Sequence, residues 1–231
     1  MVRVQSLTLA VAGAALLAPP MLSDAATRGR AEPVAWREGD VRAADLLARV
    51  RDCTQISRGR FRSDAGRPAT IAVCGTRRAV FWKADMDIDC DGQPGPRCNR
   101  RTDPSFSEAT AYQQSDGRYL SAERLPYIVV PAASRIWDHD DDGVRGGSVA
   151  AVVYRGRVQY AVVGDIGPEG IIGEASYATA KGLGIRPGAN GGTPSGVTYI
   201  VFKYSQVKPI ESHTAAVAVG RRLAQQFVHG G

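Results

Sequence analysis

The sequence predicts a mainly β protein, a small barrel of at least six strands with a few peripheral helices. Short runs rich in β-branched and aromatic residues recur between residues 70 and 204, and Gly or Pro bounds most of them. Helical periodicity occurs in only three places. Closely spaced strands without regularly alternating helices favour a barrel over a parallel βαβ sheet.

Residues 1–25 have the pattern of a secretory signal peptide. Arg3 precedes an apolar run from Leu7 to Ala18, which two prolines end. The run is shorter than the roughly 20 apolar residues needed to cross a bilayer. We therefore expect cleavage near Ala25 or Ala26 and a secreted, extracellular protein.

The rest of the chain is interpreted as a single domain over residues 40–231. Residues 26–39 mix Arg, Gly, Glu and Pro without periodicity and are expected to be a disordered lead-in. Asp40 then predicts the N-cap of a helix that continues to Val50 with one apolar face.

Strands and two helices follow in order. The strands are expected at residues 70–74, 79–83, 127–130, 148–154, 158–163 and 197–204. The segment from Tyr154 to Val158 predicts a tight hairpin, because its central Gly156 supplies a positive φ. One helix should begin near Glu174 and stop at Gly182 or Gly184, and the last should cover about 214–227.

Four cysteines in an exported chain predict two disulfides. Three pairings are possible, and we favour Cys53 with Cys74 and Cys90 with Cys98 because each closes a short loop. The net charge is +6, yet the early Arg residues are scattered without interleaved aromatics. That pattern favours a solvated surface over a nucleic-acid-binding one.

Asp165 and Glu174 are the candidate catalytic pair. An apolar strand leads into Asp165, a Gly-Pro-Glu-Gly turn reverses the chain, and Glu174 is expected in the first turn of a helix. Two carboxyl groups are what acid/base cleavage of a glycosidic bond requires. The alternative is that Asp165 closes a turn and Glu174 only favours the helix dipole, and spacing alone does not exclude it.

Aspartates recur at every second position of residues 85–91, which would place them on one face of a strand. Their mutual repulsion suggests a cationic partner, an amine or a metal. Asp87, Asp89, Asp91 and Gly92 fit the start of a calcium loop, as do residues 138–143. Position twelve is Cys98 in the first and Val149 in the second, so an EF-hand is not expected.

Other catalytic classes find no support in the sequence. The three histidines show no metal-ligand spacing, and no nucleophile elbow, dinucleotide fingerprint or phosphate loop is present. We therefore predict no metal and no cofactor.

Six ordered motifs resemble the fungal-type chitosanases of glycoside hydrolase family 75. They are KADMDIDCDG (83–92), LPYIVVP (125–131), GGSVAAVVY (146–154), GDIGP (164–168), IGEASY (172–177) and GG with SGVTY (191–199). The resemblance covers roughly residues 70–202. The strand followed by Gly-Asp-x-Gly is also similar to double-psi barrels, so we expect a six-stranded, double-psi-like barrel by analogy.

The resemblance implies endo-hydrolysis of the β-1,4 bonds of chitosan with inversion, with Asp165 as general base and Glu174 as general acid. Asp85, Asp87, Asp89 and Tyr177 are substrate-contact candidates, the aspartates because an acidic lining attracts a polyamine. The expected partner is the chitosan polysaccharide alone, without nucleic acid or membrane, and the protein is expected to be a monomer.

Three alternatives stay open at this stage. The barrel could bind a polysaccharide without cleaving it, the aspartate clusters could build a calcium-dependent module, or the same pair could cut another polysaccharide such as peptidoglycan. The acidic stretch 136–143 and the Arg-rich residues 26–67 have no clear counterpart in the family, which leaves substrate preference open.

Overall fold

The computed structural model describes residues 38–230, which belong to one compact unit. The predicted signal peptide and residues 26–37 of the predicted lead-in lie outside the described residues. Glu38, the first described residue, is tied to the barrel, since its Oε2 accepts a hydrogen bond from the N–H of Tyr160 at 2.7 Å. No helix of the described part is long and apolar enough to cross a membrane.

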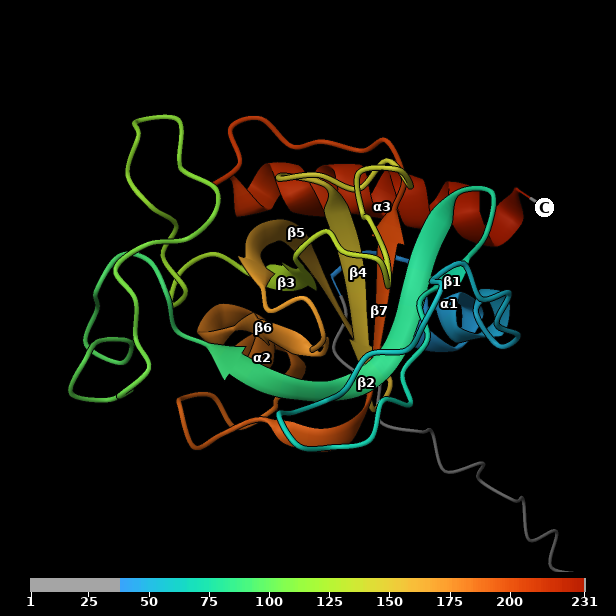
Figure 1. Cartoon of the computed structure of the whole chain (residues 1–231). Coiled ribbons are helices and arrows are strands. Elements are labelled where there is room, and N and C mark those ends of the chain that lie inside the picture. Colours follow the sequence, from blue (N-terminus) through green and yellow to red (C-terminus); the bar gives the residue numbers. More distant parts are fainter. Residues whose placement is uncertain (1–37, 231) are drawn as a thin grey trace, which may run out of the picture. The chain divides into compact units, whose positions relative to one another are not determined.

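Within residues 38–230, three helices and seven strands follow one another (Figure 1). In order they are α1 (Ala43–Arg49), β1 (Cys74–Gly75), β2 (Ala79–Asp89), β3 (Tyr127–Pro131), β4 (Val149–Tyr154), β5 (Arg157–Gly167), β6 (Glu174–Ser176), α2 (Tyr177–Leu183), β7 (Thr193–Phe202) and α3 (His213–His229).

Six of the strands close into a barrel. Their order is β2-β6-β3-β5-β4-β7, and β7 pairs back onto β2, while β1 is added to the other side of β2. Two pairs are parallel, β2 with β6 and β3 with β5. Closure leaves the six strands without an open edge. The predicted mainly β, six-stranded barrel is confirmed.

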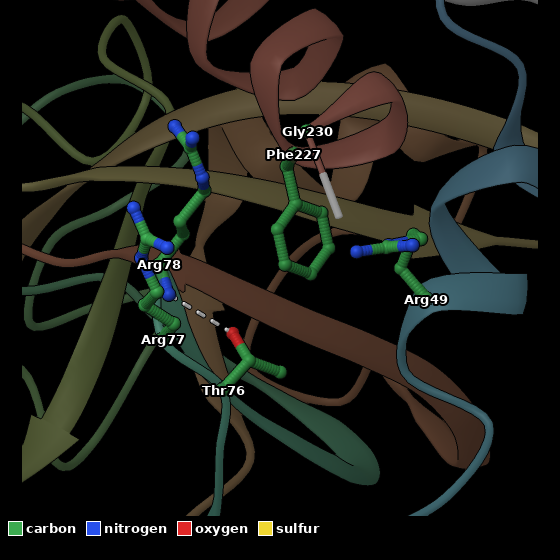
Figure 2. Close-up of a pocket in the computed structure, with 6 residues that line it drawn as sticks. All are labelled: Arg49, Thr76, Arg77, Arg78, Phe227 and Gly230. Atoms are coloured by element: carbon green, nitrogen blue, oxygen red, sulfur yellow. Dashed lines mark hydrogen bonds between the residues drawn. The ribbon is translucent and has the colours of Figure 1, made fainter.

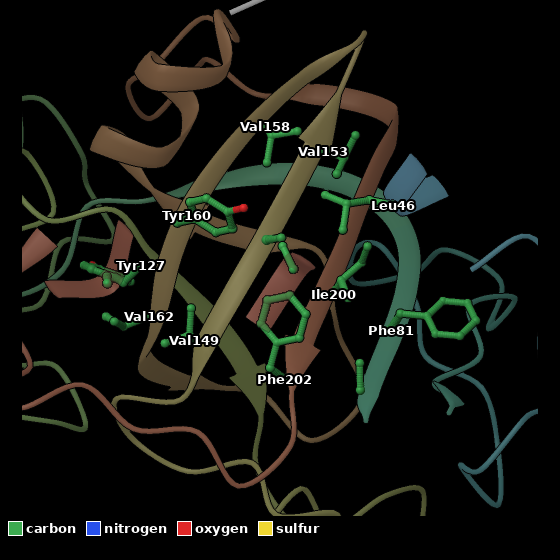
Figure 3. Close-up of a cluster of buried hydrophobic side chains, with 14 of the residues drawn as sticks. Leu46, Phe81, Tyr127, Val149, Val153, Val158, Tyr160, Val162, Ile200 and Phe202 are labelled. Carbon is green, nitrogen blue, oxygen red and sulfur yellow. The ribbon is translucent and has the colours of Figure 1, made fainter. Parts of the chain in front are cut away.

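Both faces of the barrel wall carry apolar side chains. Trp82, Met86, Val163 and Tyr199 belong to the inner cluster. Alternate residues of the same strands form an outer cluster against α1 and α3 (Figure 3). Its labelled members include Leu46, Phe81, Tyr127, Val149, Tyr160 and Phe202. Strands covered on both sides read as continuous apolar runs rather than as alternating ones.

The disulfide pairing is the expected one. Cys53 is bonded to Cys74 and Cys90 to Cys98, with Cα atoms 5.2 and 5.0 Å apart. The second disulfide lies in the long connection between β2 and β3, which projects beyond the end of β2 (Figure 1). It therefore constrains the chain immediately after the aspartates of β2.

The hairpin and the last helix are confirmed. Tyr154 pairs with Arg157, so Arg155 and Gly156 form a two-residue turn, with φ of 45° and 78°. Two positive φ values are what a type I′ hairpin requires. The last helix, α3, begins after Ser212, whose Oγ accepts a hydrogen bond from the N–H of Ala215 at 3.2 Å.

The predicted N-cap of the first helix is wrong. The residue before α1 is Arg42, which forms no side-chain cap, and Asp40 lies two residues earlier. Asp40 instead accepts a hydrogen bond from Arg221 of α3 at 2.7 Å. Val41, which lies between Asp40 and Arg42, is buried, and the helix begins only at Ala43.

Two strand predictions need correction. Residues 70–74 do not form a strand, and only two isolated bridges, from Ile71 to Phe61 and from Cys74 to Gln55, and the start of β1 lie there. In contrast, β2 does not stop at Lys83 and continues to Asp89. The alternation of aspartates with Met86 and Ile88 is itself a strand pattern, with the apolar residues packed inside the barrel.

The expected helix start at Glu174 is also wrong. Residues 174–176 form β6, and α2 begins at Tyr177 with Ser176 as its N-cap. The Ser176 Oγ accepts a hydrogen bond from the N–H of Thr179 at 3.2 Å. The helix ends at Gly184, which has a φ of 72°. Gly184 is one of the two glycines predicted to end it. Glu174 thus projects from a strand of the barrel wall.

Candidate active site

Asp87, Glu174 and Asp165 lie in one row across the outer wall of the barrel, and we call them the carboxylate row. Asp87 of β2 and Glu174 of β6 are Cα partners in a parallel pair. Ile128 of β3 pairs with Ala175, so Val129 lies beside Glu174, and Val129 pairs in turn with Asp165 of β5. Glu174 is therefore one strand from Asp87 and two strands, roughly 10 Å between Cα atoms, from Asp165.

Asp165 reaches the outer wall because of a β-bulge. Val162 and Val163 pair with Tyr127 and Ile128, but Val129 pairs with Asp165, so Gly164 is the extra residue. A Cβ at Gly164 would lie 2.5 Å from the Cβ of Tyr127, which explains the glycine. Asp165 thus lies inside β5, two residues before its end, and not in a turn.

The carboxylate of Asp165 is buried and held by two backbone donors. It is 7% exposed, and its Oδ1 accepts hydrogen bonds from the N–H groups of Ala111 and Ile166, both at 2.7 Å. Burial raises the pKa of Asp165, while these two bonds favour its ionised form and oppose the rise. The side chain is thus fixed with one oxygen occupied by the backbone.

Glu174 is suited to carry a proton near neutral pH. Burial, followed by the negative charges of Asp87 and Asp165, raises its pKa to about 7. Its Oε2 lies 3.4 Å from the place where a Cβ at Gly167 would be. The side chain therefore reaches across β3 toward β5, and the interpretation of Glu174 as a helix-terminal charge is wrong.

Asp89 lies with Asp165 rather than with the other aspartates of β2. Carboxylate oxygens of Asp89, Asp91 and Asp165 lie within 4.8 Å of one another, and we call these residues the Asp89 cluster. The Oδ1 of Asp89 accepts the N–H of Asp91 at 2.7 Å. Burial and the charges of Glu174 and Asp165 raise the pKa of Asp89 well above its usual value. Three such carboxylates could also hold a divalent cation.

Asp85 and Asp87 face a residue that the sequence did not single out, Asp64. Burial raises the pKa of both aspartates, that of Asp85 to about 7, and the negative charge of Asp64 adds to the rise in each. The loop of Asp64 is held in place by a parallel bridge between Arg62 and Ile171. We call Asp64, Asp85 and Asp87 the Asp64 cluster.

Most of these carboxyl groups have no counter-ion. None of the ion pairs between described residues includes Asp85, Asp87, Asp89, Asp91, Asp165 or Glu174. Asp64 has one cationic neighbour, Arg67, at 3.9 Å on the protein surface. The site is thus strongly negative in a chain whose net charge is +6.

Tyr177 and the second calcium-like segment make contacts of their own within the fold. Tyr177 is half-buried and packs against the outer hydrophobic cluster. Asp142 of the second segment accepts hydrogen bonds from Trp137 and Lys203, both at 2.8 Å. These bonds give Asp142 a role within the fold. Near it, Asp138, His139 and Asp140 have ligand atoms within 4.8 Å of one another, which is the spacing of a metal site.

A pocket elsewhere on the barrel has the opposite charge. Figure 2 shows Arg49, Arg77 and Arg78 around Phe227, near the end of α3. The guanidinium carbon of Arg49 lies 5.9 Å from the centre of the Phe227 ring. A cationic polysaccharide would be repelled there, so this pocket does not compete with the carboxylate row as its binding site.

A barrel wall that carries two separated, partly buried carboxyl groups amid unpaired negative charge has the make-up of a glycoside hydrolase site. Comparison with known families agrees. Residues 86–227 match the model of the fungal chitosanases of glycosyl hydrolase group 75, and the chain belongs to this family.

Curated relatives carry the same description. The chain is 33% identical over 129 residues to an endo-chitosanase C of Aspergillus oryzae, covering 54% of this chain and 31% of that protein. It is 29% identical over 141 residues to an endo-chitosanase of Aspergillus fumigatus, covering 55% and 59%. An endo-chitosanase B of Aspergillus oryzae is 32% identical over 103 residues, covering 42% and 43%. The matched region spans about a third to three fifths of these relatives.

Proposed function

We propose that this protein is an endo-chitosanase that hydrolyses the β-1,4-glycosidic bonds of chitosan. The observation that carries the proposal is the carboxylate row, in which Glu174 and Asp165 face the same side of the barrel two strands apart. Membership of the family and the names of the relatives support the substrate. The unpaired carboxylates support it too, because glucosamine units carry ammonium groups in mild acid.

In the proposed reaction, Glu174 is the general acid and Asp165 the general base. Glu174 gives its proton to the glycosidic oxygen as the bond from that oxygen to the anomeric carbon breaks. A water on the opposite face of the sugar forms the new bond to this carbon and gives a proton to Asp165, which inverts the anomeric configuration.

The environments of the two groups favour these roles. A pKa of about 7 keeps Glu174 protonated in mild acid. The two backbone donors favour the ionised form of Asp165, which a base requires. Inverting enzymes hold their carboxyl groups roughly 6.5 to 9.5 Å apart, and a separation of two strands is compatible with that range.

We further propose that Asp85, Asp87 and Asp89 attract the substrate, and that Tyr177 contacts it. The domain would cover residues 40–231 after a signal peptide of residues 1–25 and a disordered lead-in of residues 26–39. It would act outside the cell as a monomer without cofactor or metal. Two disulfides are compatible with that location.

Substitution of each carboxyl group tests the proposal. Asp165→Asn and Glu174→Gln should each lower the release of reducing ends from soluble chitosan about a hundredfold or more, with an unchanged circular dichroism spectrum. Glu169→Gln is the matched control, since Glu169 is exposed in the turn between the two. Retention of most activity by either catalytic variant would contradict the assignment.

Experiments on the unsubstituted protein distinguish the other candidate functions. Nuclear magnetic resonance of the first product should show the inverted anomer. Binding to chitosan without new reducing ends would indicate a non-catalytic barrel. Faster cleavage of chitin, cellulose or peptidoglycan would indicate another substrate for the same pair.

A further inference from the structure

We propose that Asp64, Asp85 and Asp87 form a subsite that binds the free amino group of one sugar beside the cleavage point. The subsite would make the enzyme select an unacetylated unit at that position. This inference rests on the proposed function and adds to it a site that selects between two kinds of sugar. Asp64 and Asp85 lie outside the segment that matches the family model, residues 86–227.

The position of the Asp64 cluster places a bound sugar next to the general acid. Asp85 and Asp87 are two residues apart on β2, so their side chains point to the same face. Asp87 is the register partner of Glu174. Strands lie about 4.8 Å apart, which is less than the length of one sugar unit, so the amine held here belongs to a sugar at the cleaved bond or its neighbour.

Asp85 supplies the observation that points to a ligand. Its side chain is 5% exposed, and its Oδ1 has no hydrogen-bond partner among the described residues. Burial of an unpaired carboxylate is unfavourable, and a ligand that donates hydrogen bonds and carries positive charge would remove the penalty. An ammonium group has three donors and one positive charge, which suits a site with three carboxylates.

Gly173 keeps this carboxylate close to Glu174. A Cβ at Gly173 would lie 2.3 Å from the Oδ1 of Asp85, and Gly173 has a φ of +124°. The carboxylate therefore lies against the backbone of the residue that directly precedes Glu174. A ligand bound by Asp85 would for this reason lie within reach of the general acid.

The spacing of the cluster favours an amine over a bare metal ion. Among the described residues, two groups have three ligand atoms within 4.8 Å of one another, and the Asp64 cluster is not one of them. Its three carboxylates therefore do not converge on one small ion, whereas a glucosamine unit can reach carboxylates that stand further apart with its ammonium group and its hydroxyl groups. An N-acetyl group would lack the charge and two of the three donors.

The experiment compares cleavage of chitosans of graded acetylation. Asp64→Asn and Asp85→Asn keep the shape of each side chain and remove its charge. Each should lower kcat/KM for fully deacetylated chitosan about tenfold, the loss expected for one charge-assisted hydrogen bond. Mass spectrometric sequencing of the new chain ends should show a strict preference for glucosamine on one side of the cut in the parent protein, and a relaxed one in the variants.

Controls separate this inference from the proposed function. Glu169→Gln should keep both rate and preference. Equal acetylation patterns in parent and variants would overturn the subsite while leaving the chitosanase proposal intact. If the parent cleaves no chitosan, the proposed function fails, and calorimetry of glucosamine oligosaccharides with parent and Asp85→Asn still tests the subsite. Calcium binding that Asp64→Asn and Asp85→Asn abolish would overturn the amine assignment.

Discussion

Glu174 lies directly beside Asp87 in the parallel pair of β6 and β2. After burial, the negative charge of Asp87 is the largest cause of the raised pKa of Glu174. Replacement of Asp87 by Asn should therefore lower the pKa of Glu174. The alkaline limb of the pH profile of kcat/KM should move down by roughly 0.5 to 1 pH unit. Glu169→Gln should leave the limb in place, and a limb that stays near pH 7 in Asp87→Asn would contradict the role of Glu174 as acid.

Stability should decrease as pH rises from about 4 to about 7. Burial raises the pKa values of Glu174 and Asp85 to about 7, so the folded protein keeps protons that the unfolded chain releases near pH 4. Rising pH then favours the unfolded state, by on the order of 3 to 4 kcal/mol per group, and the effect is complete about one pH unit above 7.

Urea unfolding over this pH range measures the effect. Glu174→Gln and Asp85→Asn should each reduce the slope of unfolding free energy against pH, because the amides do not titrate. A free energy of unfolding that increases from pH 4 to 7 in the parent protein would show that other groups dominate.

Gly167→Ala should lower activity more than stability. The added Cβ would lie 3.1 Å from the Cγ1 of Val129, which would have to shift by a few tenths of an ångström, and it would contact the Oε2 of Glu174 at 3.4 Å. The strand that separates Glu174 from Asp165 would therefore move, and the carboxyl group of the acid would lose free space. We expect about a tenfold loss of kcat, since small misplacement of a reacting group is costly. Thermal unfolding should show a melting temperature within a few degrees of the parent's, and an unchanged kcat would mean that Glu174 has room to move.

Chelation should leave activity and melting temperature unchanged. The proposed reaction uses only carboxyl groups and water, although the Asp89 cluster has the spacing of a cation site. Excess EDTA and added calcium are the two arms of this experiment. A melting temperature that falls with chelator would favour the calcium-dependent alternative, and Asp89→Asn would then show whether the Asp89 cluster holds the ion.

Sequence reasoning located the strands well because α1 and α3 cover the outer face of the barrel and leave long apolar runs. It missed the extension of β2, because three aspartates interrupt the apolar run there. The inward-facing Met86 and Ile88 alternate with them and still follow a strand pattern. It also took Glu174 for a helical residue, whereas Ser176 is the true N-cap of α2.

The catalytic candidates can be found from one short stretch of sequence, whereas Asp64 cannot. Asp165 and Glu174 lie nine residues apart in a glycine-rich segment, so a motif can contain both. The loop of Asp64 is held near Asp85 in part by the bridge from Arg62 to Ile171, a contact between positions more than a hundred residues apart. No local pattern carries such information.

The bulge at Gly164 decides on which side of the barrel wall the chemistry can take place. Before it, the odd-numbered residues Ala161 and Val163 point inward, and an uninterrupted strand would send Asp165 after them into the dry interior. One additional residue reverses the phase of the strand and turns that side chain outward. If the same residues formed a regular strand without the bulge, the proposed base would keep every atom and yet face the core, with no substrate within its reach.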